Sequence, residues 1–274
     1  LQQKFEGQDL QQLKKGSSDA EEFTVSFYVK GNASATYVVE MFDLDNSRQV
    51  SKTFSVTTSW TRVVLTFPAD TTGALDDDNN ASLQLGIWLH AGSNYTSGTL
   101  NSSAFAAQTS AQRAGGISSF FDSTDRTFFL TGLQLEVGNT ATTFEHRTYQ
   151  EEILRCMRYY QQLTGDDRGY NGATGSTGSF KNSVIGIYNT ATDIRAIYYH
   201  MVPMRNEPTL TVLGAVSDFD LEPFDRAPSS IAMNRAGVFQ STLLIQDSGS
   251  ATQGNAAQLT IDQAAGGLAF SAEL

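Results

Sequence analysis

Aromatic and amide side chains that can hold a sugar gather between residues 88 and 120. A sugar ring offers an apolar face that packs on aromatic rings, and its hydroxyl groups need amide, carboxylate or backbone partners. The candidates that together supply these chemistries are Trp88, Asn94, Tyr95, Phe105 and Phe120. Tyr95, in the segment GSNYTSG, is the first choice, although a loop tyrosine can also fix its own loop. Trp88 suits a ligand groove and a core position equally well.

Trp60 is predicted to pack against the protein rather than to bind a ligand. It stands at the entrance of a strand, and tryptophan is highly buried on average. Residues 53–57 and 61–67 are expected to pair around it, and Pro68 ends that ladder because proline cannot donate a backbone hydrogen bond.

No catalytic residue is predicted. A glycosidase needs two carboxylates that flank the scissile bond, and the 29 acidic residues offer only pairs such as Asp122 with Asp125 that turns explain. The three histidines are dispersed, and no nucleophile elbow or phosphate-binding loop is present. The single cysteine, Cys156, lies on a predicted helix, where burial as a small apolar residue is the simplest interpretation.

No cofactor and no metal site are predicted, with a structural Ca²⁺ as the alternative. Asp43, Asp45 and the acidic run 76–80 carry the hard oxygen ligands that Ca²⁺ prefers. They lack a complete calcium-loop pattern, and Asp and Asn predominate in turns for local reasons. We therefore expect solvated turns at both places.

The charge and hydropathy of the chain limit the classes of partner that it can bind. The net charge is −11 and only 17% of residues are charged, which argues against nucleic acid because that contact needs clustered Lys and Arg. No apolar run is long enough for a membrane span, and no signal peptide is visible, so membrane insertion is not expected. The chain begins with Leu1 rather than Met, and we expect a further N-terminal part.

Alternating apolar and polar residues predict an all-β chain in two domains. In the strand 23–30, Phe23, Val25, Phe27 and Val29 are expected to face inward. Residues 91–126 show no strand pattern, and loops of such length are commonly functional. After a glycine-rich linker at 165–178, at least six short strands predict a second antiparallel sandwich. Poor alternation at 194–201 predicts a strand that is covered on both faces.

The segment 127–162 joins these two domains. It begins with a strand at 128–137 in which Leu133, Leu135 and Val137 share one face. Thr148 and Glu151 have the spacing of a capping box, which predicts a helix start. The domains are therefore 1–147, a connecting helix at 148–164, and 165–274. The candidates for a helix face that buries itself on assembly are Ile153, Met157 and Tyr160.

A family resemblance follows from this segment. The stretch GLQLEVGNTATTFEHRTYQEEILRCMRYYQ resembles the end of a carbohydrate-binding-module-like jelly roll in bacteriophage tail-fibre and virion-appendage proteins. The upstream FTVSFYVKGNASATYVVEMFDLDN and the final LAFSAEL resemble other parts of such proteins. The resemblance implies an N-terminal jelly roll, a small C-terminal β-domain and a packing role for Trp60. In the wider group an acidic residue in the last strand often supports Ca²⁺, and this chain has Thr131-Gly132 there.

The function that the resemblance implies is that of a non-enzymatic tail fibre or receptor-binding appendage on the virion surface. Its expected partners are copies of itself in a homotrimer, other virion proteins and a bacterial surface glycan that mediates host attachment. Two alternatives stay open. One is a capsid decoration or head-fibre protein without a specific ligand, and the other is a polysaccharide depolymerase.

Overall fold

The computed structural model describes residues 1–165, 183–263 and 265–274. The chain divides into two compact units, Leu1–His146 with Leu274, and Arg147–Glu273. Strands hold 45% of the structure and helices 11%, which confirms the predicted all-β class with one substantial helix. All strand pairings within these described ranges are antiparallel. The predicted linker, apart from Gly165, lies outside the described residues.

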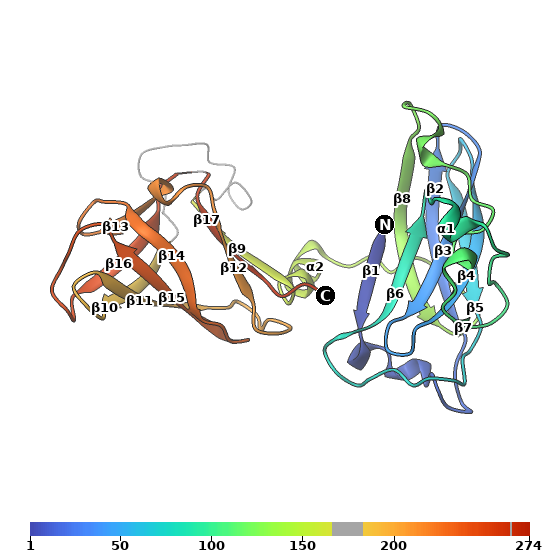
Figure 1. The fold of residues 1–274 in the computed structure, drawn as a ribbon, viewed down its shortest axis with the longest axis horizontal. Coiled ribbons are helices and arrows are strands. Elements are labelled where there is room, and N and C mark those ends of the chain that lie inside the picture. Colours follow the sequence, from blue (N-terminus) through green and yellow to red (C-terminus); the bar gives the residue numbers. More distant parts are fainter. Residues whose placement is uncertain (166–182, 264) are drawn as a thin grey trace. The chain divides into compact units, whose positions relative to one another are not determined.

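The first unit is a sandwich of a five-stranded and a three-stranded sheet (Figure 1). The five-stranded sheet has the order β1 (Gln2–Glu6), β6 (Ala81–Trp88), β3 (Ala35–Asp43), β4 (Arg48–Val56) and β7 (Ala106–Ala107). The three-stranded sheet has the order β5 (Thr61–Phe67), β2 (Phe23–Gly31) and β8 (Phe128–Val137). Short helical turns occupy the connections: Gly7–Asp9, Gln11–Leu13, α1 (Ser93–Thr96), Ser110–Gln112 and Phe120–Asp122.

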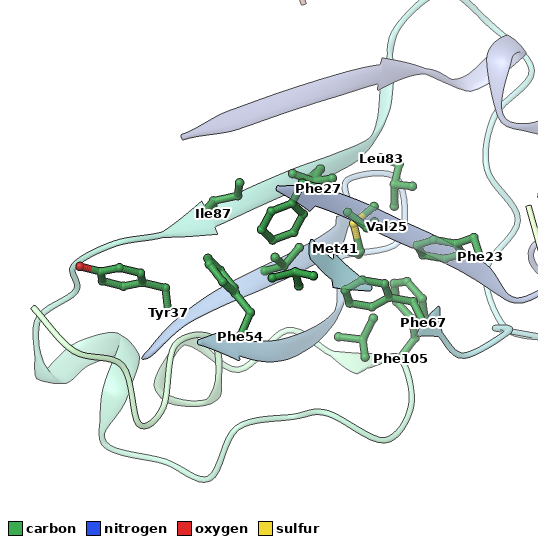
Figure 2. Close-up of a cluster of buried hydrophobic side chains, with 14 of the residues drawn as sticks. Phe23, Val25, Phe27, Tyr37, Met41, Phe54, Phe67, Leu83, Ile87 and Phe105 are labelled. Carbon is green, nitrogen blue, oxygen red and sulfur yellow. The ribbon is translucent and has the colours of Figure 1, made fainter. Parts of the chain in front are cut away.

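Side chains from both sheets fill the space between them. The four inward residues predicted for β2 are each at most 3% exposed, which confirms that alternation. Figure 2 shows Phe23, Val25 and Phe27 in one cluster with the aromatic residues Phe54 of β4 and Phe67 of β5. Phe23 stacks on Phe67 with ring centroids 5.4 Å apart, and Phe27 meets Phe54 edge to face at 5.1 Å. Aromatic pairs in these geometries add to the stabilisation from burial alone.

The predicted hairpin of 53–57 with 61–67 is wrong. Residues 53–56 end β4, which pairs with β3 and β7, whereas β5 pairs with β2 in the other sheet. The chain crosses from one sheet to the other at this point, because Phe54 and Phe67 both bury their rings in the shared core. Pro68 does follow the last residue of β5, as predicted.

A β-bulge shifts the alternation of β8 between Thr131 and Gln134, whereas Leu135 and Val137 share a face as predicted. Tyr28 pairs with Thr131 and Ser26 with Gln134, so Gly132 and Leu133 both stand opposite Phe27. Gly132 has φ of +61°, a conformation that suits glycine in a bulge. Leu135 packs against the core as predicted, whereas Leu133 and Val137 are exposed.

The second unit begins with α2 (Tyr149–Cys156) and contains two further sheets. One has the order β12 (Thr209–Leu213), β17 (Gly267–Ser271) and β9 (Tyr160–Thr164). The other has the order β13 (Phe219–Glu222), β16 (Ala256–Ile261), β10 (Ser183–Tyr188), β11 (Asp193–Tyr199), β15 (Gln240–Asp247) and β14 (Pro228–Arg235). Leu243, Phe219 and Phe270 are fully buried in the core that both sheets share. A 3-10 turn, Val216–Asp218, precedes β13.

The connecting helix is shorter than the predicted 148–164. The capping box is confirmed, since Thr148 Oγ1 accepts from Glu151 N at 3.3 Å and Glu151 Oε2 accepts from Thr148 N at 3.0 Å. The helix nevertheless ends at Cys156, which is exposed rather than buried.

The residues after the helix form β9, which pairs with β17 along its whole length. Met157 is therefore the C-cap and Tyr160 the first residue of a strand, so they form no helical face with Ile153. Pairing with β17 and burial of Gln161, whose amide donates to Val202 O at 2.8 Å, outweigh the helical pattern. This corrects the predicted assembly face.

Strand β11 is covered on one face only, contrary to the prediction. Ile194 and Ala196 lie in the core, whereas Ile197, Tyr199 and the following Met201 are exposed. The irregular sequence pattern arises because apolar residues occupy the outer face as well as the inner one.

A buried hydrogen-bond network fixes one edge of the second unit. Asp247 accepts from the Tyr188 hydroxyl at 2.6 Å, from Gly249 N at 2.9 Å and from both Nε and Nη2 of Arg226. The Arg226 guanidinium lowers the pKa of Asp247 to about 2. Burial raises the pKa of Tyr188 to about 12, and the hydrogen bond to the Asp247 carboxylate is the second contribution in the same direction.

This network predicts acid sensitivity. The folded pKa of Asp247 lies below the unfolded value, so its contribution is complete above about pH 5 and is lost as the pH falls towards 2. We expect about 2 kcal/mol of pH-dependent stability from this group. Calorimetry at pH 6 and pH 3 should show a smaller acid-induced loss for Asp247→Asn than for wild type. Asp225→Asn, which changes an exposed carboxylate nearby, should match wild type. Equal acid sensitivity in all three proteins would contradict this role.

Candidate functional site

The long loop between β6 and β8 packs on the outer face of the five-stranded sheet. Ser118 N donates to Thr36 O at 2.8 Å, Ser51 N to Asn101 O at 2.7 Å and Phe120 N to Leu89 O at 2.8 Å. Val38 faces away from the core on β3, yet it is fully buried. The predicted functional loop is thus an ordered layer over this sheet.

An ion pair fastens this loop to the sheet. Glu40, on the outward face of β3, is only 1% exposed. Arg113 of the loop donates Nε to Oε1 at 2.7 Å and Nη2 to Oε2 at 2.8 Å. Trp88 Nε1 donates to the same Oε2 at 2.9 Å. The carboxylate is therefore held by a two-point pair and an indole, as a buried charge requires.

Three aromatic rings surround the Arg113 guanidinium. Its central carbon lies 4.8 Å from the ring centroid of Phe42, 5.2 Å from that of Trp88 and 5.9 Å from that of Tyr95. The rings of Trp88 and Tyr95 are themselves 5.2 Å apart. The structure thus brings these two predicted residues together, and Tyr95 serves to hold Trp88 in place.

An open pocket of about 530 Å³ adjoins this cluster on the same sheet face. Its polar lining comes from Gln2, Gln84, His90 and Glu40. Its aromatic lining comes from Trp88, Phe120 and Phe121. Leu1, Gly86, Ile87 and Leu89 complete it. Aromatic surface combined with a few convergent polar groups is typical of small-ligand sites.

Phe121 and Gly86 give the pocket its open shape. The Phe121 side chain is 75% exposed and meets the His90 ring edge to face at 5.2 Å. His90 Nδ1 is hydrogen bonded to Ser119 Oγ at 2.9 Å, which fixes the imidazole. At Gly86 an added Cβ would stay 3.8 Å from its nearest neighbour, Glu40 Oε2, so the position is unfilled rather than crowded.

The other predicted ligand residues do not line this pocket. Phe105 is 6% exposed and packs against Phe23 with centroids 6.3 Å apart, so it belongs to the core. Asn94 is exposed on α1. Of the five predicted residues, Trp88 and Phe120 line the pocket and Tyr95 supports it.

Sequence reasoning missed Arg113, Glu40 and the two glutamines. A signal existed for Glu40, because it interrupts the apolar run Tyr37-Val38-Val39-Glu40-Met41-Phe42 of a strand. An acid at such a position needs a partner. Nothing local in the sequence identifies that partner as Arg113.

The acidic turns considered for Ca²⁺ satisfy themselves within the protein. Asp78 accepts from Asn80 N at 2.8 Å, and Asp45 accepts from Asp76 N at 3.0 Å. Asp43 is fully buried against the Lys15 ammonium at 2.5 Å. Among the residues that the structure describes, no group of three His, Cys, Asp or Glu side chains is placed to hold a metal ion.

The lining of the pocket lacks the carboxylate pair of a glycosidase. Among its lining residues Glu40 is the only carboxylate, and a glycosidase needs two. Both oxygens of Glu40 already accept hydrogen bonds from Arg113. Asp122, outside the pocket, pairs with Arg126 at 2.6 Å.

Comparison of the sequence with models of known protein families and with curated protein sequences finds no match. The class of ligand therefore has to be inferred from the geometry of the pocket and from the resemblance in the sequence. None of the helices in the described ranges is long and apolar enough to cross a lipid bilayer.

Proposed function

We propose that this chain is a non-enzymatic adhesion protein that binds carbohydrate in the pocket beside Trp88. The observation that carries the proposal is the combination of aromatic rings and glutamine amides around an unfilled glycine on one sheet face. A sugar ring would pack its apolar face on Phe121 and Trp88, while the amides of Gln2 and Gln84 would pair with hydroxyl groups.

The ion pair behind the pocket supports this proposal. Arg113 and Glu40 hold Trp88 by a stacking contact on one side and a hydrogen bond on the other. A ring that is already fixed loses little conformational freedom when a ligand binds. The pocket therefore has the pre-organised wall that a weakly binding sugar needs.

The biological role follows from the resemblance to tail-fibre proteins. We place the chain in a receptor-binding appendage on the virion surface of a tailed bacteriophage, together with other virion proteins, where it attaches to a bacterial surface glycan. Single sugar sites bind weakly, and several linked sites raise the overall affinity by orders of magnitude. A homotrimer supplies that multiplicity.

An apolar surface on the second unit supports self-association. Ile185 and Ile187 of β10 and Ile197 and Tyr199 of β11 are each between 45% and 71% exposed on the outer face of the six-stranded sheet. Contiguous exposed apolar patches of this kind mark interaction sites. This face, which we call the β10–β11 face, replaces the predicted helical stripe as the assembly surface.

Light scattering tests the assembly. We expect the wild-type chain to have the mass of a trimer, and Ile187→Glu to have a lower mass because it places a charge in the buried contact. Gln3→Glu, which adds the same single negative charge at an exposed position of the first unit, should leave the mass unchanged. A wild-type monomer at micromolar concentration would contradict the trimer.

An array of bacterial surface glycans tests the proposed function. We expect the full-length chain to bind specific glycans, and Phe121→Ala to lose them, because the substitution removes an exposed platform without opening the core. No binding by the wild type would favour a capsid decoration protein. Release of reducing ends from a bound polysaccharide would show a depolymerase. Either result would overturn the proposal.

A further inference from the structure

Trp60 is half exposed rather than packed, which corrects the sequence prediction. It is 50% exposed just before β5, and Phe129 of β8 is 49% exposed. Their ring centroids are 6.5 Å apart at 60°. Both rings lie on the outer face of the three-stranded sheet, on the opposite side of the sandwich from the pocket beside Trp88.

A lysine lies between these two rings. Lys30 of β2 pairs with Phe129 in the strand register. Its ammonium is 5.9 Å from the Trp60 centroid and 5.8 Å from the Phe129 centroid. No carboxylate among the described residues pairs with Lys30. The ammonium is therefore held over two aromatic rings with hydrogen-bond donors to spare.

The same sheet face continues with a further ring and cation. Tyr28 is 39% exposed, and the Arg62 guanidinium lies 6.0 Å from its centroid. Arg62 also donates to the Thr142 carbonyl. Thr131, opposite Tyr28, is an exposed hydroxyl side chain on this face. Aromatic rings, two cations and a hydroxyl thus lie together across three strands.

We propose that Trp60, Lys30 and Phe129 form a second carbohydrate site, selective for a sugar that carries a carboxylate. The two rings offer apolar surface to the sugar ring, and the Lys30 ammonium pairs with the carboxylate by charge-assisted hydrogen bonds. In the pocket beside Trp88, by contrast, the Arg113 guanidinium is committed to Glu40. The two sites therefore differ in ligand class, and an experiment can contradict either proposed site without affecting the other.

The overall acidity of the chain is compatible with this site. The net charge of −11 repels anions at long range. At physiological ionic strength charges more than about 8 Å apart are largely screened. At that ionic strength the contact between a sugar carboxylate and Lys30 depends on the groups beside Lys30, so we expect binding to persist at 0.15 M salt. Binding should be weakest in very dilute buffer, where the repulsion from the net charge is least screened.

Calorimetric titration with trigalacturonic acid and with its methyl ester tests the site on the full-length chain. The ester keeps the sugar rings and removes the charges. We expect wild type to bind the acid about tenfold more tightly than the ester, the size of one charge-assisted hydrogen bond. Lys30→Met should abolish that preference, and Trp60→Ala should abolish binding of both forms.

Gly86→Leu is the matched control, because it fills only the other pocket and should leave the preference for the acid unchanged. The proposal would be overturned if wild type bound the acid and the ester equally, or bound neither. It would also be overturned if Gly86→Leu abolished binding of the acid and Trp60→Ala did not. So would a Trp60-dependent dimer in light scattering, which would show that a second copy occupies this face. Trp60→Ala should keep the wild-type melting temperature, since the residue is half exposed.

Discussion

Replacing Lys15 with methionine should destabilise the first unit by about 3–5 kcal/mol, the cost of leaving buried charges without their partner. The Lys15 ammonium contacts Asp43 Oδ2 at 2.5 Å and Asp70 Oδ2 at 3.0 Å. It also donates to the carbonyl oxygens of Thr72 at 3.0 Å and Gly73 at 2.8 Å. Carboxylates and carbonyls surround this ammonium as they would a bound cation, and its side chain is only 5% exposed.

The ionised form of Asp70 also depends on its contact with Lys15. Burial alone would raise the pKa of Asp70, but hydrogen bonds from Arg48 and Lys15 outweigh burial and hold the pKa below its usual value. Without Lys15, both carboxylates would stay buried with fewer donors. Part of the lost stability should return below about pH 4, where Asp70 can take up a proton.

Urea unfolding followed by tryptophan fluorescence measures this effect, because Trp60 and Trp88 both lie in the first unit. Lys14→Met is the matched control. Lys14 is 53% exposed at its side chain and pairs with Glu21 at 3.3 Å, so its loss should change stability by less than about 1 kcal/mol. Similar unfolding midpoints for the two variants would show that the Lys15 contacts are not stabilising.

Replacing Arg113 with methionine should have the other large effect. Glu40 would remain buried without its partner, at a cost of about 3–5 kcal/mol. The variant should also weaken carbohydrate binding at least about tenfold, because Trp88 loses both the stacked guanidinium and a fixed carboxylate. The same unfolding experiment, together with glycan binding, measures both losses.

The double variant Arg113→Met, Glu40→Gln separates these two effects. Replacing both members of a buried ion pair is often nearly neutral, and the glutamine oxygen can still accept from Trp88 Nε1. We therefore expect the double variant to recover most of the stability and only part of the binding. A single variant with wild-type stability and affinity would show that the pair does not organise the pocket.

The sequence predicts the strands of the first unit well, because one face of each is buried. Strand β2 alternates almost without exception, and its four inward residues are all in the core. The segment Tyr160–Thr164 carries a helical pattern as well as β-strand residues, and only its distant partner β17 decides between them. Strand β13 has only four residues, too few for a clear periodic pattern, and β14 consists mostly of polar and small residues, so neither is evident from the sequence.

The candidate site is less predictable than the fold. Trp88 and Tyr95 could be chosen because aromatic residues near a long loop suit sugars. Their arrangement depends on the Glu40–Arg113 pair, which joins residues 73 positions apart. The average behaviour of tryptophan predicts a packed Trp60, whereas its actual exposure depends on which face of the three-stranded sheet carries its side chain. The local sequence identifies neither the Glu40–Arg113 pair nor the face on which Trp60 lies.

The most direct test of the central claim measures the affinity of a glycan selected by the array for wild type, Gly86→Ala and Gly86→Leu. An alanine Cβ at position 86 meets only ordinary contacts, and a leucine side chain extends into the space above Trp88 and Gln84. We predict near wild-type affinity for Gly86→Ala, at least tenfold weaker binding for Gly86→Leu, and equal melting temperatures for all three proteins. Unchanged affinity in Gly86→Leu would contradict carbohydrate binding in this pocket.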